Sequence, residues 1–198
     1  GRLTFVNIPN SVTTIYAYAF KECSSLTSVY IPNTVNFIDK YAFQGCGNLS
    51  EISLPSSLTT IGDYAFSGTK LSALRSASIK TIGVGAFSGS KVTEVRLDSV
   101  ETIGENAFQN CGSLQTVWLP STLASSSIGA KAFDGCNNIR HVNSKIATPS
   151  DIGDDVFSVS GTTNTATLFV PADVYERYNI GRWKNKFANI VKGEFIGE

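Results

Sequence analysis

The protein has 198 residues with 16 basic and 16 acidic side chains, so its formal net charge is zero. Charged residues make up only 16% of the chain, which argues against the concentrated positive field that binds nucleic acid or an acidic membrane surface. No stretch approaches the roughly 20 apolar residues that span a bilayer, so we expect no membrane insertion by this chain. Hydrophobic residues at 42% are sufficient for a packed core.

A phenylalanine recurs along the chain at a nearly constant interval. It ends seven windows that each begin with Ile five residues earlier, and six of these windows end in Ala-Phe, as in IGDYAF. Successive phenylalanines lie 21 to 25 residues apart, which is the period of a leucine-rich solenoid. We predict a single domain over residues 1–198, with about seven repeats in 1–171 and a cap in 172–198. The phenylalanines are Phe20, Phe43, Phe66, Phe87, Phe108, Phe133 and Phe157.

Each repeat begins with a segment typical of a short strand. In the repeat that starts at Leu49, Ile52 and Leu54 alternate as strand residues do, and Pro55 then ends the ladder. Parallel strands of successive repeats, about 4.8 Å apart, would bury their apolar side chains against each other. The predicted fold is a right-handed, β-rich superhelix, with a parallel sheet on one face and short turns or 3-10 segments on the other. The strand segment recurs from Leu3, Leu26, Leu71, Val92, Leu114 and Ile139, and ends with LFVP at 168–171.

The return half of each repeat carries a glycine and the Ala-Phe pair. Glycine follows the Ile in five of seven repeats, with Tyr16 and Asp39 as the exceptions. This frequency predicts a backbone conformation that a Cβ would hinder. The phenylalanine ring is expected to fill the interior, while the small alanine lets the backbone approach closely. The glycines are Gly62, Gly83, Gly104, Gly129 and Gly153.

Four cysteines follow the same period, each three residues after a repeat phenylalanine. Two other repeats carry Thr69 and Ser90 at this position, which predicts a small buried site. We favour free thiols. The alternative is a disulfide between adjacent repeats, because neighbouring turns could bring two Cα atoms into bonding range. The candidate pairs are Cys23 with Cys46 and Cys111 with Cys136.

The pattern changes after Pro171. Asp173 is expected to cap a short helix that carries Val174, Tyr175 and Tyr178 on one side. Trp183, Phe187 and Ile190 continue the apolar stripe. Because an open solenoid exposes its last core layer, this segment is predicted to be the lid that covers it.

These motifs together resemble the bacterial surface-antigen, or BspA-like, type of leucine-rich repeat. The resemblance covers about residues 3 to 192 and is carried by LxxVxIP, the Ser/Thr turn, AFxGC and a terminal VPxxxxxxY followed by WK and Phe. It implies a secreted or surface-anchored protein of a host-associated microbe, with a role in adhesion to host matrix proteins or other cells. It implies no catalytic residues and no cofactor.

Two outward positions of each predicted strand should align as columns across the sheet. Tyr, Arg and Trp are enriched at binding hot spots, so the second column supplies the candidate partner-binding residues. The alternative is that Arg75 makes weak solvated pairs with Glu51 or Glu94 and that the aromatic residues only shield the sheet. The first column is Phe5, Ser28, Glu51, Ala73, Glu94, Thr116 and His141; the second is Asn7, Tyr30, Ser53, Arg75, Arg96, Trp118, Asn143 and Phe169. The candidate residues are Tyr30, Arg75, Glu94, Arg96 and Trp118.

Other chemistry finds little support. His141 is the single histidine, which argues against a multi-histidine metal site or a serine triad; we expect it to be an exposed strand residue. The glycines of GVGAFSG belong to the repeat rather than to a phosphate loop. Asp151, Asp154 and Asp155 form the one acidic cluster and are expected to be solvated rather than to hold calcium. We therefore predict no enzyme, no cofactor and no metal.

Three functions remain. The leading hypothesis is a noncatalytic, monomeric module that binds a host or microbial protein through the exposed sheet face. The second is carbohydrate binding, with Tyr30 and Trp118 as flat apolar surfaces. The third is a structural spacer without its own ligand. Secretion or display at the cell surface is expected in each case.

Overall fold

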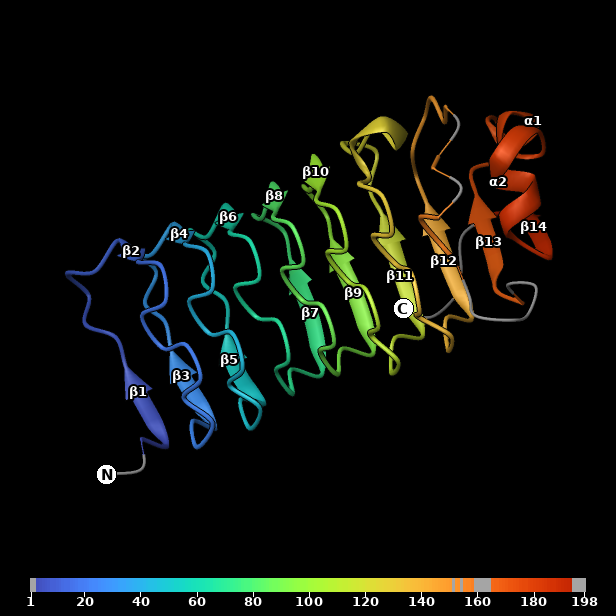
Figure 1. Ribbon diagram of the computed structural model, residues 1–198. Coiled ribbons are helices and arrows are strands. Elements are labelled where there is room, and N and C mark those ends of the chain that lie inside the picture. The colour runs from blue at the N-terminus through green and yellow to red at the C-terminus, as the bar shows by residue number, and fades with distance from the viewer. Residues whose placement is uncertain (1–2, 151, 154, 159–164, 194–198) are drawn as a thin grey trace.

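The computed structural model describes residues 3–150, 152–153, 155–158 and 165–193. Within these residues the chain forms a parallel β-solenoid of about eight turns that ends in two short helices (Figure 1). The predicted fold class is confirmed. Each turn contributes one strand to a wide face. These strands are β1 (Phe5–Asn7), β3 (Ser28–Tyr30), β5 (Glu51–Ser53), β7 (Ala73–Ser76), β9 (Glu94–Leu97), β11 (Thr116–Leu119), β12 (His141–Ser144), β13 (Thr167–Val170) and β14 (Asn189–Lys192).

Within each of the two sheets that form the wide face, the strands keep one register from turn to turn. Val6 pairs with Val29 and Val29 with Ile52, and the same position continues through Leu74, Val95, Val117, Val142 and Leu168. Side chains alternate between the two faces of a strand, so this register directs one apolar side chain per turn into the core. The ladder is divided into a three-stranded sheet, β1-β3-β5, and a six-stranded sheet that begins at β7.

The opposite side of the coil contains a second, narrow parallel sheet that the sequence did not predict. Its strands have two residues each, and in four of the five these are Thr-Ile. We expected turns and 3-10 segments here; among the described residues a single 3-10 segment is found, Ser125–Ser127. Successive Thr-Ile pairs lie directly above one another, and β-branched residues favour extended backbone. The strands are β2 (Thr14–Ile15), β4 (Phe37–Ile38), β6 (Thr60–Ile61), β8 (Thr81–Ile82) and β10 (Thr102–Ile103).

The interior is filled by the predicted column of phenylalanine rings. From Phe20 to Phe157 each ring stacks nearly parallel on the next, with centroids 4.9 to 5.4 Å apart. The rings from Phe43 to Phe157 are buried. The alanines that precede Phe43 to Phe133, and Val156 before Phe157, are buried as well, so the backbone packs closely beside each ring, as expected.

The glycine after each Ile is explained by close approach between turns. A Cβ placed on Gly62 would lie 2.7 Å from the backbone nitrogen of Lys40 in the preceding turn, which is a steric clash. Left-handed backbone occurs elsewhere, at the residue before each Ala-Phe pair. Tyr18, Tyr41 and Tyr64 have φ of 62°, 60° and 55° there, and their rings stack 5.0 and 5.2 Å apart. The sequence pattern did not reveal this second aromatic column.

The C-terminal segment covers the last layer of the core. It contains α1 (Tyr175–Tyr178), α2 (Gly181–Lys186) and β14, which pairs with β13. The Phe187 ring meets the last ring of the interior column, Phe157, edge-on at 5.2 Å, and Trp183 is 1% exposed. Tyr178 is buried and its hydroxyl contacts Ser144 Oγ at 2.7 Å.

Two details of the predicted cap are wrong. Asp173 does not cap α1, because Val174 holds the N-cap position and no side chain bonds to the helix terminus. Ile190 belongs to strand β14 rather than to a helical stripe, since the chain turns back after Phe187 and adds a strand to the sheet. Tertiary pairing with β13 decides this segment.

Candidate functional site

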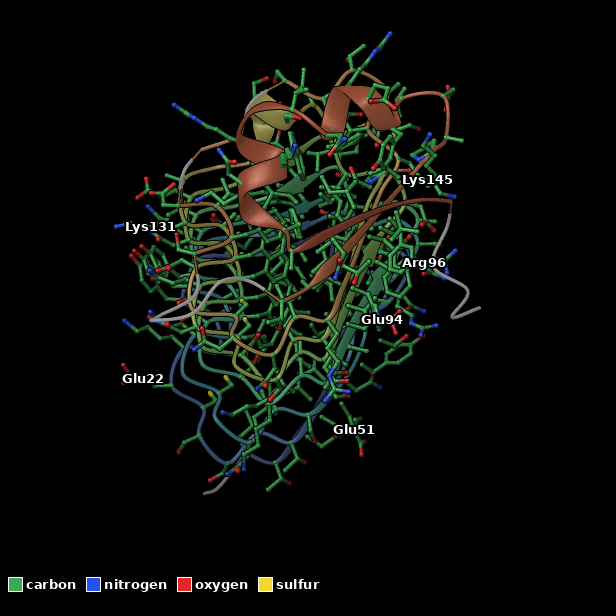
Figure 2. The ribbon with its side chains drawn as sticks, turned by 90° about the vertical axis from the view of Figure 1, so that its right-hand side faces the viewer. Glu22, Glu51, Glu94, Arg96, Lys131 and Lys145 are labelled. Atoms are coloured by element: carbon green, nitrogen blue, oxygen red, sulfur yellow. The ribbon has the colours of Figure 1, made fainter. Side chains whose placement is uncertain are left out.

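The second outward column runs along the centre of the six-stranded sheet. Arg75 pairs with Arg96, Arg96 with Trp118, and Trp118 with Asn143 across adjacent strands. The three side chains therefore lie one strand apart on the same face. Figure 2 shows Glu94, Arg96 and Lys145 along this side of the molecule, with Glu22 and Lys131 on the opposite side.

Arg96 is held between an aromatic ring and a carboxylate. Its guanidinium carbon lies 5.7 Å from the centre of the Trp118 ring, within the range of a cation–π contact. Its Nε lies 3.5 Å from Asp98 Oδ1. With one third of its side chain exposed, Arg96 presents a partly ordered guanidinium to solvent.

Arg75 is paired with Glu94 on the next strand. Arg75 Nη2 donates to Glu94 Oε2 at 2.7 Å, while the Arg75 side chain stays 65% exposed and that of Glu94 is 20% exposed. Of the two carboxylates considered from the sequence, Glu94 is therefore the partner rather than Glu51. A guanidinium has five N–H donors, so this pair leaves donors of Arg75 directed to solvent.

Tyr30 is separated from the other candidates. It is 52% exposed on β3, in the three-stranded sheet, and Ser53 of β5 stands between it and Arg75 in the column. The structure thus brings Arg75, Glu94, Arg96 and Trp118 together and leaves Tyr30 apart from them.

Beyond Trp118, the second outward column continues through Asn143 and Phe169, as predicted, and then through Val191, which was not predicted. Asn143 pairs with Trp118 and so keeps the outward register, but it is only 4% exposed and is therefore not open to solvent. Phe169 follows in register and pairs with Val191 of β14, which is 41% exposed. Val191 was missed because β14 was not predicted. His141 is half-buried, with its ring 5.9 Å from Phe169, and not a fully exposed strand residue.

The cysteines are free thiols, as we favoured over a disulfide. Cys46, Cys111 and Cys136 are buried, and each thiol donates to the carbonyl oxygen of a phenylalanine in the preceding turn at 3.0 to 3.1 Å. Burial raises the pKa of the Cys46 thiol to about 11. A hydrogen bond to Cys111, together with burial, also raises the pKa of Cys136. The hydrogen bond with Cys136 lowers the pKa of the Cys111 thiol. The enclosed thiols of Cys46 and Cys136, whose pKa is raised, are structural rather than nucleophilic.

No cluster of three His, Cys, Asp or Glu that could hold a metal occurs in the described part of the chain. Asp151 and Asp154 of the acidic cluster lie outside that part. Among the described residues, none of the helices has the length and apolar character needed to cross a membrane.

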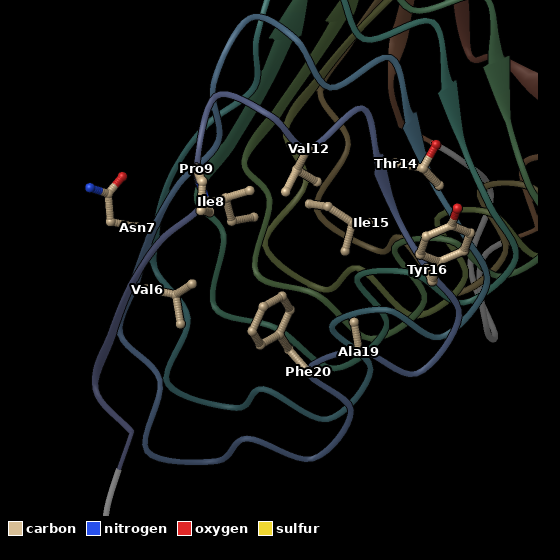
Figure 3. A pocket seen from close by; sticks show the side chains of 10 residues that line it. All are labelled: Val6, Asn7, Ile8, Pro9, Val12, Thr14, Ile15, Tyr16, Ala19 and Phe20. Atoms are coloured by element: carbon tan, nitrogen blue, oxygen red, sulfur yellow. The ribbon is translucent and has the colours of Figure 1, made fainter.

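The N-terminal end of the coil has an apolar hollow of about 270 Å³. Figure 3 shows Val6, Ile8, Val12, Ile15 and Phe20 around it. These are the core residues of the first turn. At the other end of the coil, the corresponding last layer of the core is covered by the helical cap. The residues of the hollow belong to the first turn, with β1 and β2, which lies at one end of the coil, whereas β7, β9 and β11, which carry Arg75, Arg96 and Trp118, lie further along it (Figure 1).

Comparison with known proteins identifies the repeat. A family model described as the BspA type leucine-rich repeat region matches six copies, over residues 2–100 and 73–176. The chain belongs to the BspA-type leucine-rich repeat family. No curated protein matches the chain.

Solved structures with this BspA-type architecture include two from bacteria. A leucine-rich repeat protein from Bacteroides ovatus is 25% identical with a TM-score of 0.66, and the match covers 94% of this chain and 50% of that one. The T. pallidum leucine-rich repeat protein is 22% identical with a TM-score of 0.50, over 96% of this chain and 70% of that one. The chain thus spans about half the length of the B. ovatus protein. BspA-type repeat proteins are in general noncatalytic.

Proposed function

We propose that this chain is a noncatalytic, monomeric binding module, folded as one domain, that recognises a protein partner through the wide sheet face. One observation carries the proposal: the register places Arg75, Arg96 and Trp118 side by side on adjacent strands. Arginine and tryptophan are the residue types that dominate binding energy at protein interfaces. A solenoid also offers an extended surface that suits a macromolecular partner.

The state of these side chains supports a binding role. Arg96 lies against Trp118 and Asp98, and Arg75 is tied to Glu94, so less side-chain entropy remains to be lost on binding. Tyr30 is a separate, exposed contact at the edge of the same surface. Family membership supports secretion or display at the cell surface, where such a module would meet host matrix or microbial surface proteins.

Carbohydrate binding is the weaker hypothesis. A sugar ring usually needs an open aromatic face, and the guanidinium of Arg96 covers one face of Trp118. A spacer role would require that the sheet face be inert.

The test is a double variant, Arg96→Gln with Trp118→Ala, compared with the off-face control Tyr16→Ala with Lys40→Gln, whose residues are exposed on another side of the coil. Beads carrying each protein are tested on immobilised extracellular-matrix proteins and, in parallel, on a glycan array. We expect the sheet-face variant to lose more than tenfold in protein binding while its circular dichroism stays unchanged and the control binds normally. Binding confined to glycans, or no binding by any form, would contradict the proposal.

A further inference from the structure

The wide face contains one break among its described strands, between β5 and β7. Every other pair of neighbouring strands on this face is joined by a parallel ladder. The main-chain bond from Lys70 N to Leu49 O, 2.9 Å, precedes the break. After it, no main-chain hydrogen bond joins residues 50–54 to residues 71–76 in the described structure.

The two sides of the break are nevertheless held together. Beyond it, Ser78 Oγ donates to Leu58 O at 2.9 Å, and Lys80 N donates to Thr59 O at 2.8 Å. The solenoid is thus continuous before and after the break. The result is a short local split, at which two strand edges face each other without pairing.

The connection that leads into β7 is shorter than the one that leads into β5. Ile52 follows Phe43 by nine residues, whereas Leu74 follows Phe66 by eight. The strand of the fourth turn is therefore reached by a connection one residue shorter, at the point where β7 would have continued the ladder from β5. This step coincides with the lost pairing but does not by itself cause it, because the connection changes again between β9 and β11, from eight residues (Phe87 to Val95) to nine (Phe108 to Val117), and those two strands stay paired.

The split opens a hollow on the surface. A hollow of about 380 Å³ is lined by Leu54, Pro55, Ser56 and residues 75–78, a size at the lower end of the range for ligand pockets. Ile52 and Leu54 are only partly buried, while their equivalents in the next turns, Leu74 and Leu97, are buried. The split therefore exposes apolar side chains that the ladder covers elsewhere.

Arg75 stands at the wall of this hollow. It also lines an adjoining hollow of about 320 Å³ together with Arg96 and Asp98. Because its contact with Glu94 uses one side of the guanidinium, donors remain for a second carboxylate. The groove thus combines open main-chain groups, an apolar floor and a cation.

We propose that the split between β5 and β7 is a groove that binds an extended peptide segment carrying a carboxylate. Unpaired N–H and C=O groups of a strand edge match those of another polypeptide, as in β-strand addition. Arg75 selects the carboxylate, and Leu54, which lines the hollow, contacts the neighbouring apolar side chain. This inference rests on the proposed protein-binding role and specifies the chemistry of the partner.

The first test needs no ligand. The amides of Glu51 and Thr116 donate to the preceding turn at 3.2 and 3.3 Å, whereas the equivalent residue Ala73 has no such bond across the split. We expect the Ala73 amide to exchange with solvent faster than those of Glu51 and Thr116 in native-state hydrogen exchange. Equal protection of the three amides would mean that the split is closed in solution and would overturn the proposal.

The second test uses the peptide acetyl-Thr-Val-Asp-Val-Thr-amide as the probe, followed by amide chemical shifts of the ¹⁵N-labelled protein. We expect shifts confined to residues 50–54 and 71–77. A matched peptide with Asn in place of Asp should bind about tenfold more weakly, the effect of losing one charge-assisted hydrogen bond. A peptide with N-methylated valines, which lacks those N–H donors, should bind more weakly still.

A variant pair identifies the cation. Arg75→Gln should abolish the preference for the Asp peptide over the Asn peptide, while Arg140→Gln, at another exposed arginine, should retain it. Shifts elsewhere, equal binding of the N-methylated peptide, binding of maltohexaose at the same amides in place of peptide, or no binding at millimolar peptide would each overturn the groove. If these tests exclude peptide binding in the groove, but Arg96→Gln with Trp118→Ala still abolishes binding to a protein partner, the proposed function stands without the groove.

Discussion

The column of stacked phenylalanine rings inside the solenoid and the second outward column of the wide face differ in how much their residues vary from turn to turn. Inside, each turn presents the same residue, and the rings from Phe43 to Phe133 stack at 5.2 to 5.4 Å. Outside, on strands that are equally regular, the side chains change from Tyr30 to Arg75 and then to Trp118. A ring buried between two copies of itself tolerates little change in volume. An outward strand position needs only extended backbone, so its side chain is open to selection for binding.

The largest effect is expected from breaking the interior column at its centre. Phe87 is fully buried and stacks on Phe66 and Phe108. Phe87→Ala should lower the free energy of unfolding by about 3–5 kcal/mol, because it leaves a cavity between two rings that cannot close over it. Urea unfolding followed by circular dichroism gives the measurement.

The matched change on the exposed column is Trp118→Ala. It removes a larger ring, but one that is only half-buried, and should cost about 1 kcal/mol or less. If Phe87→Ala and Trp118→Ala lowered the free energy of unfolding equally, the interior column would not be more sensitive to a change in volume than the outward column.

A smaller effect is expected at the cap. The Tyr178 hydroxyl donates to Ile146 O at 2.9 Å and contacts Ser144 at 2.7 Å. Tyr178→Phe keeps the ring but leaves both buried groups without this partner, and should cost about 1–3 kcal/mol. Tyr175→Phe is the control, because the ring of Tyr175, rather than its hydroxyl, contacts Lys192. A cost at Tyr175 as large as that at Tyr178 would contradict the assignment.

The smallest effect is a pH dependence of stability that comes from one buried thiol of the interior. Burial raises the pKa of Cys46 from 9.0 to about 11. Below pH 9 the thiol is protonated in both the folded and the unfolded chain. Between pH 9 and 11 the unfolded chain releases this proton first, so folding stability should fall as pH rises through this window.

Cys46→Thr removes the titrating group and introduces the residue that the next turn carries as Thr69. The variant should lose less stability than the parent between pH 9 and 11, measured as the shift in urea midpoint from a value below pH 9. An identical alkaline loss in both proteins would show that Cys46 does not contribute to it.

Much of the fold could be predicted from single positions in the repeat. The phenylalanine interval gave the turn length, and the LxxVxL spacing gave both the strands and the register of the outward columns. The glycine after the Ile was recognised as a constrained position, but the expected cause was wrong: Gly62 has no left-handed backbone, and close approach of the preceding turn accounts for it instead. These features were accessible because stacked turns require the same residue type at the same place, and such a requirement is visible as a period in the sequence.

Other features depend on contacts that occur only once in the molecule and therefore leave no periodic pattern in the sequence. The strand at Asn189–Lys192 forms because β13 offers it an edge, so a local helical pattern was misleading there. The pairing of Arg75 with Glu94 rather than Glu51 followed from the break between β5 and β7. Asn143 became buried although its position in the strand is an outward one.

The sequence by itself therefore determined the coil, its interior and the alignment of the outward side chains, because all three repeat with the chain and depend on nearest-neighbour stacking. Tertiary structure alone decided where that regularity ends: at the cap, in the separation of Tyr30 from the arginine and tryptophan cluster, and at the split beside Arg75. Repeat spacing alone does not locate the split, because the connection length also changes by one residue between β9 and β11 and that pair keeps its ladder. Whether two neighbouring strands pair is set by how the turns pack in three dimensions.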